Sequence, residues 1–237
     1  MQGEVIIILV LVASFAGTLT GFGTSTILVP FISLSYPLPE TLLFVGIIHL
    51  FGDIWKMVFF KKGVRWKLIL LFGIPGIAFS YFASRLPVNI PEPNLRRMLG
   101  IFLVLYVVFL FIKSKWKLRQ NDFNALVGGG LSGFFAGLFG VGGAVRGAFL
   151  TTFNLKKEVY IFTSGTIGLL IDTSRLIGYT KSGIRLASYN FTLLFVSILI
   201  SFLGAYLARF AVGKIPQSKF RVVTAFGLVV VGIYYLL

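Results

Sequence analysis

The chain has 237 residues, of which 57% are hydrophobic and 12% charged, and 22 Lys and Arg against 7 Asp and Glu give it a formal net charge of +15. The mean hydropathy of +0.95 excludes an ordinary soluble domain and a disordered chain, since both need a larger share of charged or polar residues. Several apolar stretches approach the roughly 20 residues that cross a bilayer. The composition therefore indicates a polytopic membrane protein with the lipid bilayer as its surroundings.

The residue inventory also limits the chemistry. The chain has no Cys, one His and seven acids, which leaves no disulfide, no thiolate ligand and no nucleophile–base set. We therefore expect no enzymatic activity, no cofactor and no metal site. The bases lie in short connections between apolar runs rather than on one face, so we expect no nucleic-acid partner. Glu4 is the only early charge, which is unlike a cleavable signal peptide.

The first half of the chain contains four apolar segments. The first, from Val5 to Leu34, is interrupted at residues 20–24 and ends before a Pro-rich turn at 36–39. The interruption holds two glycines, which break helices, and the prolines cannot continue one. Three further helices are predicted near 41–60, 68–85 and 96–112.

The second half repeats this order. An apolar stretch at 124–154 is broken at 140–143, and helices follow near 158–179, 189–210 and 219–237. Recurring residues support an internal repeat, because an acid followed by a base three residues later occurs at Asp53 and Lys56 and again, 119 positions further on, at Asp172 and Arg175. The chain therefore reads as one membrane domain made of two repeats, residues 1–115 and 120–237.

Each broken stretch has about 30 residues, whereas two full crossings need about 40. We therefore predict a re-entrant hairpin of two half-helices, followed by three transmembrane helices, in each repeat. The resulting odd number of crossings makes the two repeats inverted. Inversion gathers 14 bases on one side, which the positive-inside rule makes cytoplasmic, with both termini outside. These bases are Lys61, Lys62, Arg65, Lys67, Lys113, Lys115, Lys117, Arg119, Lys156, Lys157, Arg209, Lys214, Lys219 and Arg221.

Broken helices at matching positions of inverted repeats are typical of transporter sites near the bilayer centre. A helix that starts after a break directs free N–H groups and a positive dipole end inward, which favours an anion. Arg146 lies in an otherwise apolar segment just after the second break and is a candidate anion anchor. The alternative for Arg146 is a structural role, in which it reaches an interface or pairs with Asp53 or Asp172. Small residues that only allow close helix packing are the alternative. The candidate substrate-binding residues are Thr20, Gly21, Phe22, Gly23, Thr24, Ser25, Gly140, Val141, Gly142, Gly143 and Arg146.

The symmetric acids form a second candidate group. Asp53 precedes Lys56, and Asp172 precedes Arg175, by three residues, so each pair shares a helix face. A structural ion pair is one interpretation of both pairs, and ion coupling is the other. His49 lies one turn before Asp53 and would complete a proton relay. Protons are therefore a candidate coupling partner, and a homodimer is a candidate assembly.

Three segments carry a resemblance to a known family. They are Ala16-Gly17 with Gly21-Phe22-Gly23, then Gly137-Leu138-Phe139-Gly140-Val141-Gly142-Gly143-Ala144, and Thr163-Ser164-Gly165-Thr166. The chain resembles, over essentially its whole length, the TauE/SafE family of sulfite exporters and the related permeases for 4-toluene sulfonate uptake. It departs from the usual Gly-rich run by having Thr24-Ser25-Thr26 at the first break.

The resemblance implies a plasma-membrane exporter of small sulfur-containing anions, such as sulfite, sulfoacetate and other organosulfonates, driven by protons or the membrane potential. Related thiosulfate carriers rely on cysteines, and this chain has none. From the residues alone, two other functions stay open. An anion channel would also use broken helices, and a non-transporting scaffold subunit would need only the packing role of the small residues.

Overall fold

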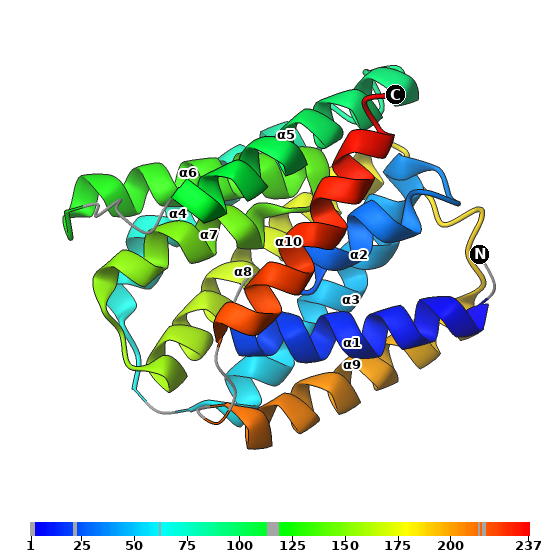
Figure 1. Cartoon of the computed structure of the whole chain (residues 1–237). Coiled ribbons are helices and arrows are strands. Elements are labelled where there is room, and N and C mark those ends of the chain that lie inside the picture. Colours follow the sequence, from blue (N-terminus) through cyan, green and yellow to red (C-terminus); the bar gives the residue numbers. More distant parts are fainter. Residues whose placement is uncertain (1–2, 21–22, 62, 113–118, 213, 215–216) are drawn as a thin grey trace.

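A computed structural model describes the chain except for residues 1–2, 21–22, 62, 113–118, 213 and 215–216. The described residues form helices and no strand (Figure 1). The first half contains α1 (Gly3–Thr20), α2 (Ser25–Ile32), α3 (Leu38–Phe59), α4 (Trp66–Ala83) and α5 (Glu92–Ile112). The second contains α6 (Asp122–Phe139), α7 (Gly142–Leu150), the short 3-10 turn η2 (Thr151–Phe153), α8 (Lys157–Lys181), α9 (Phe191–Ala211) and α10 (Gln217–Tyr234).

The predicted helices and both interruptions are present. Gly23 and Gly140, with φ angles of 83° and 72°, lie in the two breaks, and a residue with a side chain would be strained there. α3 begins at Leu38, earlier than predicted, with a proline in its first turn. This is physically reasonable because the N–H groups of a first helical turn have no partner within the helix.

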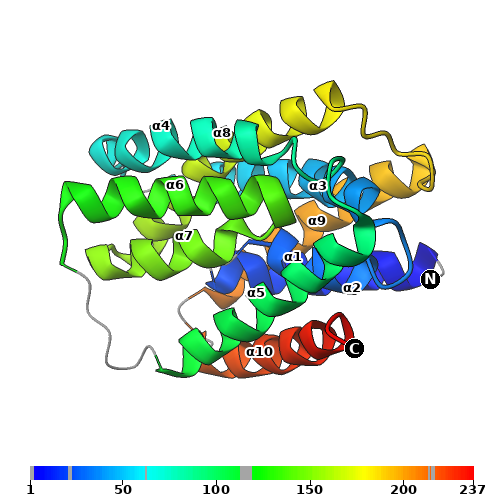
Figure 2. The same ribbon diagram turned by 90° about the horizontal axis from the view of Figure 1, so that it is seen from above.

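The two arms of each broken stretch differ in length, contrary to the prediction of two half-helices. α1 and α6 have 18 residues each, whereas α2 and α7 have 8 and 9. At 1.5 Å per residue the first arms are about 27 Å long. In Figure 2, α7 turns back alongside α6, and this hairpin and the α1–α2 hairpin start from opposite ends of the molecule.

Glycines let α6 and α4 pack with their backbones in contact. Gly129, Gly133 and Gly137 of α6 recur every four residues, and a Cβ on any of them would overlap backbone atoms of α4. α1 packs in the corresponding way on α9, where Gly204 faces the backbone at Leu11. Small residues at such crossings are common between membrane helices because they allow close approach.

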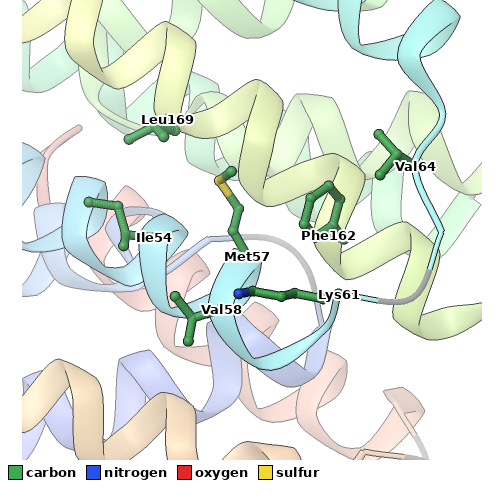
Figure 3. A pocket seen from close by; sticks show the side chains of 7 residues that line it. All are labelled: Ile54, Met57, Val58, Lys61, Val64, Phe162 and Leu169. Atoms are coloured by element: carbon green, nitrogen blue, oxygen red, sulfur yellow. The ribbon is translucent and has the colours of Figure 1, made fainter.

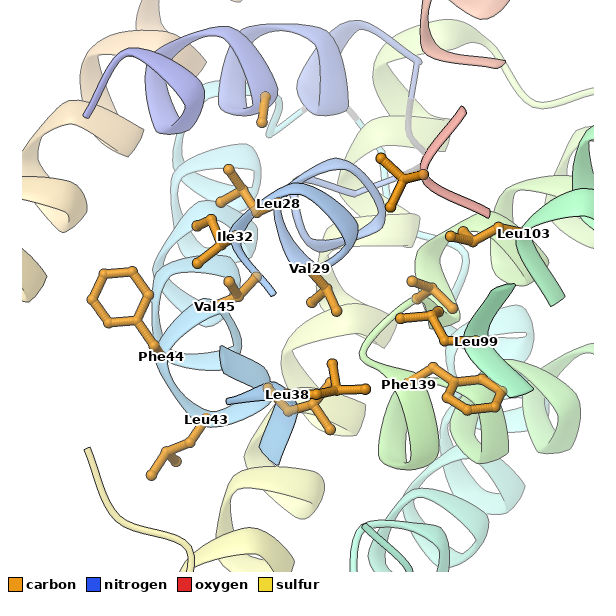
Figure 4. Close-up of a cluster of buried hydrophobic side chains, with 14 of the residues drawn as sticks. Leu28, Val29, Ile32, Leu38, Leu43, Phe44, Val45, Leu99, Leu103 and Phe139 are labelled. Atoms are coloured by element: carbon orange, nitrogen blue, oxygen red, sulfur yellow. The ribbon is translucent and has the colours of Figure 1, made fainter. Parts of the chain in front are cut away.

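The outside of the bundle is apolar as well as its interior. Five described helices are long and apolar enough to cross a bilayer: Gly3–Thr20, Leu38–Phe59, Trp66–Ala83, Glu92–Phe111 and Phe191–Ala211. Large side chains such as Phe79, Phe82 and Phe191 are exposed on their outer faces. Inside, Leu28 and Val29 of α2 pack with α3, α5 and the end of α6 (Figure 4). These apolar contacts hold the short helix α2, and the break that precedes it, against α3.

Candidate functional site

Two buried ion pairs face each other where α3 and α8 pack together. Lys56 Nζ lies 2.7 Å from Asp53 Oδ1, and Arg175 Nε lies 2.7 Å from Asp172 Oδ1. All four residues are at most 2% exposed. The i, i+3 spacing places each acid and its base on one helix face, and the packing of α3 on α8 brings the two faces together.

His49 links the two halves of the chain. Its Nδ1 is 2.5 Å from Asp172 Oδ2 and 3.8 Å from Asp53 Oδ2. Because a carboxylate paired with Arg175 is an acceptor, the hydrogen between the ring and Asp172 belongs to Nδ1. The other ring nitrogen, Nε2, is buried without a hydrogen-bond partner in the described part of the chain. It lies against the first break, since a Cβ on Gly23 would be 2.5 Å from it.

Arg146 reaches the same cluster from α7. Its side chain is 1% exposed, and its Nε donates to Ser164 Oγ at 3.1 Å. Its Nη2 is 3.8 Å from Asp53 Oδ2, which is beyond hydrogen-bond distance, and has no hydrogen-bond partner among the described residues. A buried guanidinium with unused donors can bind an anion.

The second break is held by α8. Tyr179 Oη donates to the carbonyls of Gly137, at 2.6 Å, and Ala136, at 3.1 Å, in the last turn of α6. Arg175 Nη1 lies 3.4 Å from the Ala136 carbonyl and would be 3.2 Å from a Cβ on Gly140. One break therefore adjoins His49 and the other adjoins Arg175.

The structure brings together six of the candidate residues: His49, Asp53, Lys56, Arg146, Asp172 and Arg175. We call these six residues the charged core. Gly23 and Gly140 flank it, and Thr24 and Ser25 are buried at the start of α2. Gly143 is buried in the first turn of α7. The candidates Gly21 and Phe22 lie outside the described residues.

Other candidates at the breaks have different surroundings. The Thr20 hydroxyl donates to the Ala16 carbonyl of its own helix. Val141 is buried in the hydrophobic core, and Gly142 faces α6, where the Ser132 hydroxyl donates to its carbonyl at 2.9 Å. Val141 and Gly142 therefore make packing contacts in the described structure.

Three residues that were not among the sequence candidates contact the charged core or its flank. They are Ser164, Gly168 and Tyr179, all on α8. A Cβ on Gly168 would overlap Asp53 Oδ2 and lie 2.7 Å from Arg146 Nη2. Gly168 follows His49 by 119 positions, the same shift that relates Asp53 to Asp172. This shift could have identified Gly168 from the sequence as the counterpart of His49.

A metal ion is a second chemical interpretation of part of this cluster. One ligand atom from each of His49, Asp53 and Asp172 lies within 4.8 Å of the others. However, Lys56 and Arg175 already pair with the two carboxylates, and Arg146 adds a third cation. Three positive groups at this distance oppose a divalent cation, so the donor set does not fit a metal.

The charges of the described core favour an anion instead. It contains three cationic side chains and two carboxylates, so one positive charge is in excess when the imidazole is neutral. In a poorly solvated interior an uncompensated charge is costly. A single bound negative charge would balance it.

An apolar pocket of about 440 Å³ is lined by residues of α3, of α8 and of the segment that follows α3 (Figure 3). Met57 of α3 and Phe162 of α8 line it, and Lys61 supplies its one charged side chain. None of the six residues of the charged core lines this pocket. Its apolar walls suit lipid chains rather than a small anion.

Comparison with known proteins bears on the family and the class of the chain. The family described as "Sulfite exporter TauE/SafE" matches residues 6–235, which confirms the resemblance seen in the sequence. A probable membrane transporter protein of Methanocaldococcus jannaschii is 26% identical over 260 residues, covering 98% of this chain and 94% of that protein. Family and relative, with the apolar helices, indicate a multi-pass membrane protein of transporter type.

Proposed function

The chain belongs to the TauE/SafE sulfite exporter family, and on that premise we propose that it is a secondary transporter of small sulfur-containing anions. Sulfite and organosulfonates such as sulfoacetate are the proposed substrates, and export is the proposed direction. The anion binds at the charged core, between the two helix breaks. The observation that carries the proposal is the buried, incompletely hydrogen-bonded guanidinium of Arg146.

Arg146 suits an oxyanion for geometric reasons. A planar guanidinium can give two parallel hydrogen bonds to two oxygens of a sulfonate or sulfite. Its Nε is engaged by Ser164 Oγ, whereas Nη2 faces Asp53 at 3.8 Å. An anion can therefore take Nη2 without breaking a hydrogen bond of the described structure, and the Ser164 hydroxyl is close enough to contribute.

Inverted repeats support alternating access around this site. We infer that α1–α5 and α6–α10 are the two repeats, because the same helix pairing occurs twice across them. α4 of the first repeat packs on α6 of the second, and α9 of the second packs on α1 of the first. α3–α8 and α5–α10 pair across the two halves. The charged core lies where α3 and α8 meet, so rocking of one repeat against the other would expose it to either side.

The orientation follows from the distribution of bases. With inverted repeats the 14 bases named above share one side, which we propose to be cytoplasmic. The connections on this side include exposed Arg65 and Lys156, whereas exposed Arg185 belongs to the other side. Outward movement of anions is favoured by an inside-negative membrane potential, which supports export.

Anion binding to Arg146→Gln tests the proposal, with Arg185→Gln as the matched control at an exposed position. Thermal unfolding of the detergent-purified protein is followed with sulfite, sulfate, sulfoacetate, methanesulfonate, acetate and chloride at equal ionic strength. A ligand of the folded state raises the unfolding temperature by mass action. We expect stabilisation by sulfite or a sulfonate in the parent chain and in Arg185→Gln, and its loss in Arg146→Gln.

Three other results would count against the proposal. Unchanged stabilisation of Arg146→Gln would remove Arg146 from the site. No stabilisation by any anion would favour the scaffold function, in which the glycines serve packing alone. Flux that stays linear with anion concentration would favour a channel.

A further inference from the structure

His49 is the one histidine of the chain, and its surroundings differ from those of the other core residues. Lys56 and Arg175 each have a carboxylate partner at 2.7 Å. His49 makes one short hydrogen bond through Nδ1, to Asp172. Its Nε2 is buried and has no hydrogen-bond partner among the described residues. With its hydrogen on Nδ1, a neutral ring directs the lone pair of Nε2 toward Gly23 in the first helix break.

The charged groups around His49 come from three helices. Asp53 and Lys56 lie on its own helix, α3, while Asp172 and Arg175 lie on α8 and Arg146 on α7. The break that touches Nε2 contributes Gly23, which has no charge. Two carboxylates and three cationic side chains thus surround the imidazole. A change of one charge at the site alters the balance of charge around the ring.

The charge of the bound anion supplies that change. A monoanion cancels the single excess positive charge of the core while the imidazole is neutral. A dianion leaves one negative charge uncompensated, and a proton on Nε2 restores neutrality. Protonation there leaves the Nδ1–H bond to Asp172 intact, because the second N–H forms on the opposite side of the ring.

We propose that His49 is the proton-binding residue that adapts one anion site to two ligand charges. A singly charged oxyanion binds with neutral His49, and a doubly charged one binds together with a proton on Nε2. Ligand and proton together then add one negative charge in both cases. The inference rests on the proposed anion site and names its ligand class, small oxyanions whose charge is −1 or −2, as sulfite has near neutral pH.

Proton uptake on binding tests this directly. Sulfate, a dianion, and methanesulfonate, a monoanion, are titrated into the detergent-purified full-length chain by calorimetry in two buffers of different ionisation enthalpy. From linkage we expect uptake of about one proton per sulfate and about none per methanesulfonate. In His49→Gln, which keeps a polar group but cannot titrate, we expect no uptake and about tenfold or more weaker sulfate binding. Sulfate affinity is expected to fall by a larger factor than methanesulfonate affinity in this variant.

A second measurement needs no variant. Because the chain has a single histidine, nitrogen NMR of the tag-free protein labelled at histidine reports one imidazole. Sulfate is expected to convert its signals to those of an imidazolium, while methanesulfonate leaves the Nδ1–H tautomer. Absence of proton uptake with sulfate, or one proton still taken up by His49→Gln, would overturn the inference and leave the anion site standing. If none of the four anions sulfate, methanesulfonate, sulfite and sulfoacetate bound the parent chain, the inference and the proposed function would be overturned together.

Discussion

Removing the charge of Asp172 is expected to destabilise the fold strongly. Its Oδ1 accepts from Arg175 Nε at 2.7 Å and its Oδ2 from His49 Nδ1 at 2.5 Å. Both Arg175 and Asp172 are at most 2% exposed. In Asp172→Asn the single amide oxygen can accept from only one of these two donors, so the change removes the counter-charge of a buried guanidinium and one hydrogen bond.

The expected loss follows from burial. Removing one partner of a buried ion pair costs about 3–5 kcal/mol, since the remaining charge cannot be solvated. The pair between Lys67 and Asp122, at 2.8 Å, provides the matched control because these side chains are 73% and 59% exposed. An exposed pair contributes about 0–1 kcal/mol, so Asp122→Asn is expected to change stability little.

Equilibrium unfolding of both variants by sodium dodecyl sulfate in mixed micelles measures the difference. We expect Asp172→Asn to lose at least about 2 kcal/mol more free energy of unfolding than Asp122→Asn, which is the gap between the two classes of pair. Equal losses in the two variants would refute the reasoning, because they would mean that Arg175 does not depend on Asp172 for its counter-charge.

Two further predictions concern the core and the topology. Gly168→Ala places a Cβ against Asp53 Oδ2 and 2.7 Å from Arg146 Nη2, so anion binding is expected to fall. Gly130→Ala is the control, because a Cβ there would lie at ordinary contact distance, 3.5 Å, from Phe79, and it is expected to bind normally; equal binding by both would contradict the packing. The cysteine-free chain allows single-cysteine labelling at Arg65 and Arg185, which lie at matching positions of the two repeats. Inversion predicts labelling of Arg185→Cys by an impermeant maleimide from outside and of Arg65→Cys only after permeabilisation, and labelling from one side would indicate parallel repeats.

The helices and their breaks could be predicted from local patterns. Apolar runs near membrane length specify helices, and Gly23 and Gly140 lie where two of them are interrupted. The unequal arms of the hairpins were not predicted, because total length cannot place a break within a segment. Eighteen residues precede each break, so the first arms have nearly the length of a full crossing.

The charged core could be predicted only within each helix. The i, i+3 spacing placed Asp53 with Lys56 and Asp172 with Arg175, since such pairs depend on one helix alone. The bond between His49 and Asp172 depends on the register between α3 and α8, to which no local pattern points. Gly168 escaped notice for a related reason: its role is to leave space for Asp53 and Arg146.

The hydroxyl and glycine candidates at the breaks illustrate the same limit. Thr20 satisfies its hydroxyl within α1, and Gly142 provides close packing against α6. Both residue types suit either an anion or a helix crossing, so their chemistry alone does not choose between the two. Ser164 of α8, which accepts from Arg146, is a hydroxyl that contacts the charged core.

Counterflow in proteoliposomes tests the central claim most directly. Vesicles loaded with unlabelled sulfite or sulfoacetate are diluted into a trace of the same radiolabelled anion, with parent chain, Arg146→Gln or Arg185→Gln in the membrane. A carrier with its anion site at the charged core predicts transient accumulation of label, saturable and retained in Arg185→Gln, and none in Arg146→Gln. Accumulation that persists in Arg146→Gln, or its absence in the parent chain for every anion that binds, would contradict the account.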